Sequence, residues 1–130
     1  MRILVCYDSS EQSKNAIKMA QSQATAFNGK IFVVTTLEKG VPDNQNEINA
    51  AKKELEAVAT QLKSGGIECQ TDLLIHGLGP GEDLVKYTAE KEIDMAVIGI
   101  VKKSKVGKLF FGSTAQYLIL NAPCPVLTVK

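Results

Sequence analysis

The 130-residue chain has little of several features on which common functions depend. It contains no Trp, and aromatic residues make up only 5% of it, which argues against a surface for stacking single-stranded nucleic acid. Its 15 basic and 14 acidic residues leave a net charge of +1, so no overall positive charge is available to attract a nucleic acid. We therefore expect no nucleic-acid partner.

Long apolar runs and paired cysteines are also missing. No stretch of 18 uninterrupted apolar residues is present, so no contact with a membrane is expected. Cys6, Cys69 and Cys124 form no C-x-x-C pair, which argues against a zinc site or a redox pair. Their odd number favours a reducing, cytoplasmic location. Cys6 lies in an apolar run and is expected in the core, and "MRILVCYDSS" predicts a first strand rather than a signal peptide.

The residues of familiar catalytic sites are equally scarce. No pair of carboxylates has a spacing that suggests general acid–base catalysis, and no metal-ligand cluster is visible. The lone histidine, His76, has no evident partner, so a structural role is expected for it. A P-loop is excluded, because in the segment 102–109 Lys102 occupies the first glycine position and Leu109 the Ser/Thr position. The sequence therefore predicts a protein that is not an enzyme, with at most slow ATP hydrolysis or phosphotransfer.

What the sequence does contain is a regular alternation of two kinds of segment. Short apolar runs, typical of buried parallel strands, occupy 3–7, 31–37, 69–75, 95–100 and 125–129. Amphipathic segments, typical of helices, lie between them at 13–27, 46–66, 80–93 and 113–121. The apolar residues of the segment 13–27 fall on one helical face, namely Ala16, Ile17, Ala20, Ala24 and Phe27. Those of the segment 46–66 also fall on one face, namely Ile48, Ala51, Leu55, Val58 and Leu62.

This alternation predicts a single α/β domain over residues 1–130, with a doubly wound, Rossmann-like parallel sheet of five strands. We expect the strand order 3-2-1-4-5, with helices on both faces. Ligands of such sheets bind beyond the carboxyl ends of the strands where the order reverses, here between the first and fourth strands. The segments "YDSS" (7–10) and "GIVKKSKVGKLFFGS" (99–113) follow those two strands.

The second segment carries candidate phosphate-binding residues. Gly99 ends a strand where a side chain would otherwise block a ligand, and Gly112 precedes a helix whose first amides would attract an anion. The hydroxyls of Ser113 and Thr114 would add hydrogen bonds to a phosphate. The alternative is purely structural, because Gly112 also suits a turn, and Ser113 with Gln116 has the spacing of a capping box.

Charged residues in these two segments have similar alternatives. Lys102, Lys103, Lys105 and Lys108 would neutralise a polyphosphate, or would lie on a solvated loop. Asp8 would accept hydrogen bonds from a ribose or an adenine amine or help to hold Mg²⁺, or it would cap the first helix with Glu11 three residues on.

The whole chain resembles the universal stress protein (UspA-like) family. The resemblance lies in "ILVCYDSSEQSKNAIKMA", "GLGPGEDLVKYTAEKEIDMAVIGI" and "GKLFFGSTAQYLILNAPCPVLTV", and in the order of the elements. Nucleotide-binding members carry G-x2-G-x9-G-[ST] after the fourth strand. Gly99, Gly112 and Ser113 match this motif, whereas Lys102 replaces its second glycine. A lysine there would either block the phosphates or supply charge to them.

The resemblance implies a small ATP-binding or adenine-nucleotide-binding regulatory protein of the stress response, with or without Mg²⁺ beside the ATP. In this chain Asp8 would contact the ribose or adenine, the backbone of Thr36 would face the adenine edge, and Thr114 would join Ser113 at the phosphates. Family members are generally homodimers, which implies pairing through the last strand, 125–130. The replacement at Lys102 favours an alternative, a dimeric stress-response interaction module that does not bind nucleotide.

Overall fold

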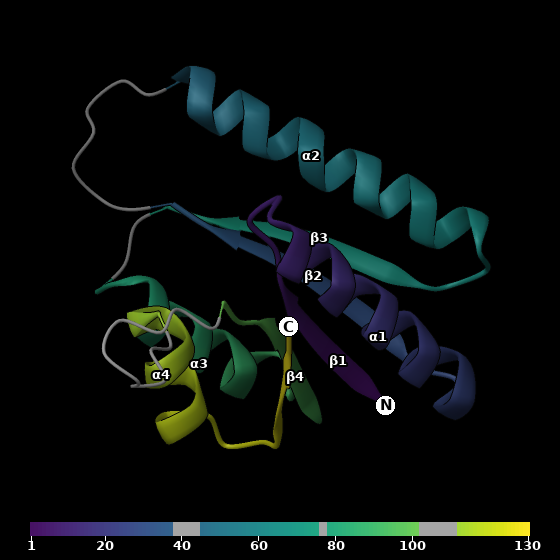
Figure 1. The fold of residues 1–130 in the computed structure, drawn as a ribbon. Helices are drawn as coiled ribbons and strands as arrows, with labels where there is room; N and C mark the ends of the chain where they lie inside the picture. The colour runs from purple at the N-terminus through teal and green to yellow at the C-terminus, as the bar shows by residue number, and fades with distance from the viewer. Residues whose placement is uncertain (38–44, 76–77, 102–111) are drawn as a thin grey trace.

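A computed structural model of the protein describes residues 1–37, 45–75, 78–101 and 112–130. Helices and strands alternate along these residues in the predicted order (Figure 1). The strands are β1 (Arg2–Cys6), β2 (Lys30–Thr36), β3 (Cys69–Leu74), β4 (Met95–Gly99) and β5 (Val126–Val129). The helices are α1 (Glu11–Phe27), α2 (Gln45–Ser64), α3 (Pro80–Glu90) and α4 (Ser113–Asn121).

The five strands form one parallel sheet in the order β3-β2-β1-β4-β5, which confirms the predicted fold class and strand order. Helices α1 and α2 cover one face of this sheet, and α3 and α4 cover the other (Figure 1). All five strands point the same way, so their carboxyl ends meet along one edge of the sheet. The segments that follow β1, β2 and β4 are thereby brought together.

Two apolar cores fix this arrangement, one on each face of the sheet. Alternate residues of a strand point to opposite faces, so Ile3 and Val5 of β1 pack toward α1 and α2, while Leu4 packs toward α3 and α4. All three side chains are fully buried. A central strand buried on both faces explains why its sequence is a continuous apolar run rather than an alternating one.

The predicted helix faces are largely but not wholly buried. Four of the five residues predicted to share one face of α1 are buried, namely Ala16, Ile17, Ala20 and Ala24. The fifth, Phe27, is 56% exposed, so the prediction that it lies on the buried face was wrong. Phe27 lies in the last turn, where Asn28 adopts a left-handed conformation (φ 52°) and the chain leaves α1 for β2.

The second helix shows the same effect at its start. Leu55, Val58 and Leu62 are buried, but Ile48 and Ala51, nearer the start of α2, are only partly buried. No helix within the described ranges is long and apolar enough to cross a membrane.

Candidate functional site

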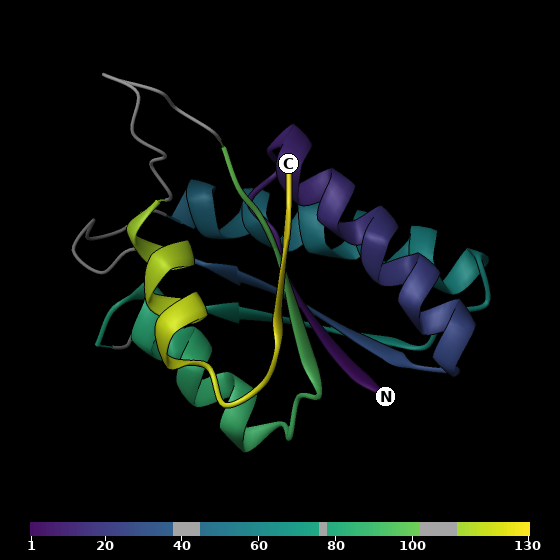
Figure 2. The ribbon, with the colours of Figure 1, turned by 60° about the horizontal axis from the view of Figure 1, so that its bottom comes forward.

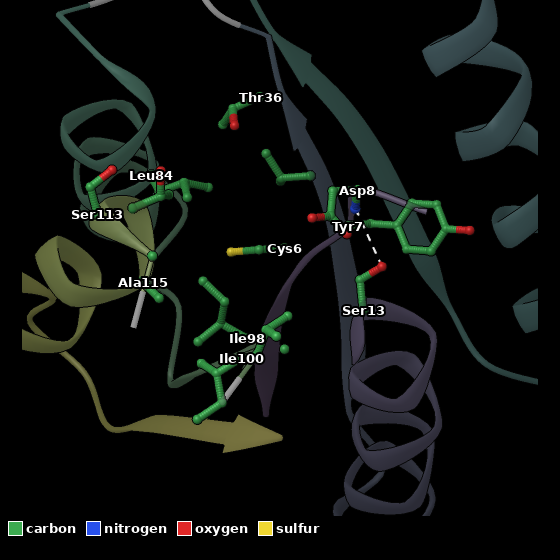
Figure 3. Close-up of a pocket in the computed structure, with 15 residues that line it drawn as sticks. Cys6, Tyr7, Asp8, Ser13, Thr36, Leu84, Ile98, Ile100, Ser113 and Ala115 are labelled. Atoms are coloured by element: carbon green, nitrogen blue, oxygen red, sulfur yellow. Dashed lines mark hydrogen bonds between the residues drawn. The ribbon is translucent and has the colours of Figure 1, made fainter. Parts of the chain in front are cut away.

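A pocket of about 430 Å³ opens at the carboxyl ends of the strands (Figure 3). It is bounded by the ends of β1, β2 and β4 and by the first turn of α4, at the predicted point between the first and fourth strands. Its lining includes the predicted binding residues Asp8, Thr36, Gly99, Gly112, Ser113 and Thr114. The structure therefore brings together residues that are up to 106 positions apart in the chain.

Several other residues singled out from the sequence lie outside the described ranges. These are Lys102, Lys103, Lys105, Lys108 and His76.

The loop after β1 holds Asp8 at the polar end of the pocket. Asp8 Oδ1 accepts a hydrogen bond of 3.0 Å from the backbone N–H of Ser10. Ser10 in turn is the N-cap of α1, where its hydroxyl oxygen accepts a hydrogen bond of 3.1 Å from the backbone N–H of Ser13. The alternative that Asp8 caps this helix, with Glu11 three residues on, was therefore wrong. Since Ser10 performs the capping, the carboxylate of Asp8 lies on the pocket side of the loop.

The charge state of Asp8 follows from its surroundings. Partial burial alone would raise the pKa of Asp8, but hydrogen bonds from Ser10 and Ser13 outweigh that effect and hold its pKa below the ordinary 3.8. The carboxylate is therefore ionised at neutral pH and acts only as a hydrogen-bond acceptor. Such a group suits the hydroxyls of a sugar or an amine on a base.

Replacement of Asp8 by Asn should change how stability depends on pH. Because the folded-state pKa of Asp8 is lowered, its stabilising contribution is present above the unfolded value and is lost as pH falls through the folded value. Between about pH 5 and about pH 3, we expect the free energy of unfolding to fall more steeply for the wild type than for Asp8→Asn. Urea unfolding at several pH values measures this difference, and parallel curves would contradict it.

Gly99, at the end of β4, has a structural reason to be glycine. A Cβ atom there would lie 2.5 Å from the carbonyl carbon and 2.6 Å from the carbonyl oxygen of Gln12. The absent side chain lets the first turn of α1 pack directly against β4. Packing against Gln12 is thus a reason for glycine at this position that the sequence did not reveal, and Gly99 also lines the pocket.

Gly112, unlike Gly99, has no packing contact among the described residues that calls for glycine. It is the N-cap of α4 with an ordinary φ of −55°, and an added Cβ would meet no atom of the described residues within 4 Å. Ser113 is the first residue of the helix rather than its cap, so the predicted capping box with Gln116 was wrong. Neither backbone conformation nor packing among the described residues requires a glycine at position 112.

Within the described part of the chain, no atom therefore lies close enough to Gly112 to close off the start of α4. The first N–H groups of a helix have no partner within the helix, and with the helix dipole they attract anions. Ser113 and Thr114 line the pocket beside these amides and carry hydroxyl donors. This is a suitable environment for a phosphate group.

The other end of the pocket is apolar. Val34, Leu84, Ile98 and Ala115 line it, and Figure 3 shows the Cys6 sulfur pointing into the space between the sheet and Leu84 and Ala115. Burial, followed by the nearby charge of Asp8, raises the pKa of Cys6 to about 12, so its thiol is uncharged. Cys6 was expected in the core, and its place in the pocket lining was not predicted. An apolar run gives no sign of which of its side chains faces a cavity.

The pocket thus joins an apolar chamber to a polar rim with one carboxylate and one helix N-terminus. Among its described lining residues Asp8 is the only carboxylate, so these residues supply no acid–base pair. Within the described part of the chain, no group of three or more His, Cys, Asp or Glu side chains could hold a metal ion. The arrangement suits binding of a molecule with a flat apolar part and an anionic part.

Comparison with known proteins agrees with this geometry. The family model of the universal stress protein family matches residues 1–130. The chain belongs to the universal stress protein family. A universal stress protein of Thermus aquaticus is 33% identical over 135 residues, which cover 98% of this chain and 97% of that protein.

Two solved structures from Archaeoglobus fulgidus are also similar. One universal stress protein has a TM-score of 0.88 and 33% identity, with coverage of 100% of this chain and 98% of the other. A second, solved in complex with dAMP, has a TM-score of 0.83 and 29% identity at the same coverage.

Proposed function

We propose that this protein binds an adenine nucleotide in the pocket at the ends of β1 and β4. The observation that carries the proposal is the N-terminus of α4, where the backbone angles of Gly112 do not require glycine and no described residue packs against it. A helix start left clear in this way, beside Ser113 and Thr114, is suited to a phosphate. A related universal stress protein solved with dAMP supports the same ligand class.

The rest of the nucleotide is assigned by chemistry. The apolar chamber around Cys6, Leu84 and Ile98 would hold the base, with Thr36 at its edge. The ionised carboxylate of Asp8 would accept hydrogen bonds from the sugar hydroxyls or a base amine. The base, the sugar and the phosphate would thereby each contact a different part of the pocket: the apolar end, Asp8 and the start of α4.

ATP, with Mg²⁺, is the proposed physiological ligand. The sequence carries four lysines between residues 102 and 108, which would offset the charge of a triphosphate. Lys102→Gly restores the glycine of the family motif and separates two roles for this lysine. A gain of ATP affinity would mean that Lys102 obstructs the phosphates, and a loss would mean that it contributes charge to them.

The proposed role is regulatory rather than catalytic, in the stress response and in the cytoplasm. Asp8 is the sole carboxylate among the described lining residues and is held ionised, so it is poorly placed to alternate between acid and base. We expect ATP hydrolysis to be slow at best.

We also propose that the protein is a homodimer paired through the last strand, residues 125–130. In the described sheet β5 is an edge strand, and an uncovered edge offers backbone groups to a second strand. Antiparallel pairing of two β5 strands would join two such sheets into one.

Native mass spectrometry of the purified protein tests both proposals together. We expect the mass of a dimer with adenine nucleotide retained from the expression host, identified after denaturation. A dimer that carries no nucleotide, and gains none when millimolar Mg-ATP is added, would instead support the alternative of an interaction module without nucleotide binding. A monomer that binds ATP would refute only the dimer.

A further inference from the structure

β3 forms the edge of the described sheet that lies opposite to β5. In a strand, the backbone N–H and C=O groups of successive residues point to opposite sides. The carbonyl oxygens of Glu68 and Leu74 accept hydrogen bonds of 2.9 Å from β2 and from the residue after it. The odd-numbered residues between them, Cys69, Thr71 and Leu73, therefore direct their N–H and C=O groups toward the open edge.

This edge lacks several features by which proteins prevent a further strand from pairing. Proline, lysine and bulges on an edge strand have that effect. The sequence of β3 contains neither proline nor lysine, and its six residues pair with β2 in unbroken register from Cys69 to Leu74. β3 is therefore regular enough to act as a template for one more strand.

A groove of about 250 Å³ lies beside this edge, where β3 ends near α3 (Figure 2). Its described lining comes from residues 73–75 and from one stripe of α3, with the spacing of a single helix face: Asp83, Lys86, Tyr87 and Glu90. Leu73, whose backbone groups point outward, belongs to the lining, so the groove reaches the open edge. Alternate side chains of a strand added to β3 would point toward α3 and enter the groove.

The groove carries more negative than positive charge. Lys86 Nζ lies 3.8 Å from Glu90 Oε1, so these two charges offset each other. Asp83 forms no ion pair with any residue that the structure describes. Asp72 adds a further carboxylate, which accepts a hydrogen bond from the hydroxyl of Tyr87 in the groove wall. Two carboxylates are thus available to a basic side chain.

We propose that β3 pairs with an extended segment of a partner protein whose basic side chains enter the groove beside α3. Backbone hydrogen bonds along an edge strand supply affinity, and pockets for alternate side chains supply specificity. Asp72 and Asp83 would attract lysine or arginine at these positions and repel an acidic segment. A second copy of this chain is a poorer occupant, because two-fold pairing of β3 would bring two acidic grooves together.

This surface is separate from the pocket at the ends of β1 and β4. The two share no residue among those described as lining them. The proposed strand pairing therefore does not depend on nucleotide binding, and it leaves β5 free.

The peptide acetyl-Val-Lys-Val-Lys-Val-Lys-Val-amide, with a fluorescent label, is a suitable probe because all its lysines lie on one face of a strand. Fluorescence anisotropy measures its Kd. We expect saturable binding to the wild type, and binding about tenfold weaker when glutamate replaces lysine. The lysine peptide with every inner amide N-methylated keeps its charge but loses its backbone donors, so it should not bind.

Thr71→Pro tests the edge itself. The N–H of Thr71 points away from β2, so proline removes no hydrogen bond of the sheet but blocks a strand on the open side. We expect the Kd of the lysine peptide to rise about tenfold or more. Thr71→Val is the matched control, since it keeps the N–H, and its Kd should equal that of the wild type.

Asp83→Lys tests the charge of the groove. We expect it to raise the Kd of the lysine peptide about fivefold, as for a partly exposed charge pair. Glu82→Lys is the matched control, because Glu82 lies in the same first turn of α3 and is exposed but does not line the groove. Its Kd should stay within about twofold of the wild type.

Each outcome decides part of the proposal. No binding of the lysine peptide at millimolar concentration, or equal binding of its N-methylated form, would overturn it. An unchanged Kd in a folded Thr71→Pro variant would show that the peptide binds elsewhere. Equal affinity for the lysine and glutamate peptides would refute the basic partner. Circular dichroism melting shows whether Thr71→Pro folds, and the N-methylated peptide tests strand pairing without any change to the protein.

Discussion

Gly99→Ala should destabilise the protein by about 3 kcal/mol, at the upper end of the usual cost of overpacking. The new Cβ would lie 2.5 Å from the backbone of Gln12, so either α1 or β4 has to move. Backbone atoms in the first turn of a helix have less freedom to adjust than the end of a flexible side chain. In a domain of this size, the melting temperature should fall by roughly 10 °C.

Gly112→Ala is the matched control for this change. Both glycines line the same pocket, but an added Cβ at position 112 meets no atom within 4 Å in the part of the chain that the structure describes. We expect its cost to stay below about 1 kcal/mol, the scale of a change in N-cap preference. Calorimetric melting of the two variants compares them directly. Equal losses of stability would contradict the structural role assigned to Gly99.

Gly112→Ala combined with Ser113→Ala should lower ATP affinity about a hundredfold while the protein stays folded and dimeric. The methyl group at position 112 would enter the space through which a phosphate approaches the first amides of α4. Loss of the Ser113 hydroxyl removes a hydrogen bond to a charged group, which alone contributes about 1.5–3 kcal/mol. Titration calorimetry with Mg-ATP measures the affinity, and sedimentation measures the dimer.

Gln116→Ala serves as the control on the same helix. Gln116 is exposed on α4 and does not line the pocket, so its truncation should leave ATP affinity unchanged. If the double variant binds ATP as tightly as the wild type does, the phosphates do not lie at the start of α4. A matching loss of affinity in Gln116→Ala would point to a general disturbance of the helix.

The fold was predictable because it depends on patterns that repeat along the chain. Runs such as "ILVCY" and "MAVIGI" are apolar on both faces, and amphipathic segments of helical period separate them. Alternation of this kind leaves few topologies once crossovers are right-handed. The strand order and the meeting of Asp8 with Ser113 at one edge follow from that topology.

The reasons behind single residues were less predictable, because they depend on contacts between distant segments. Gly99 is small to fit Gln12, 87 positions away, and no local pattern records that contact. Ser10 rather than Asp8 caps α1, a choice that depends on the exact residue at which the helix begins. Cys6 faces the pocket because the sheet ends there, whereas its sequence context is that of any core residue.

Calorimetric titration of the purified wild-type protein with Mg-ATP tests the central claim most directly. We predict saturable binding of one nucleotide per chain, with a rise in melting temperature, since a ligand at about 100 times its Kd stabilises the folded state by about 2.7 kcal/mol. Absence of heat and of any thermal shift at millimolar Mg-ATP would contradict the claim that this pocket is a nucleotide site.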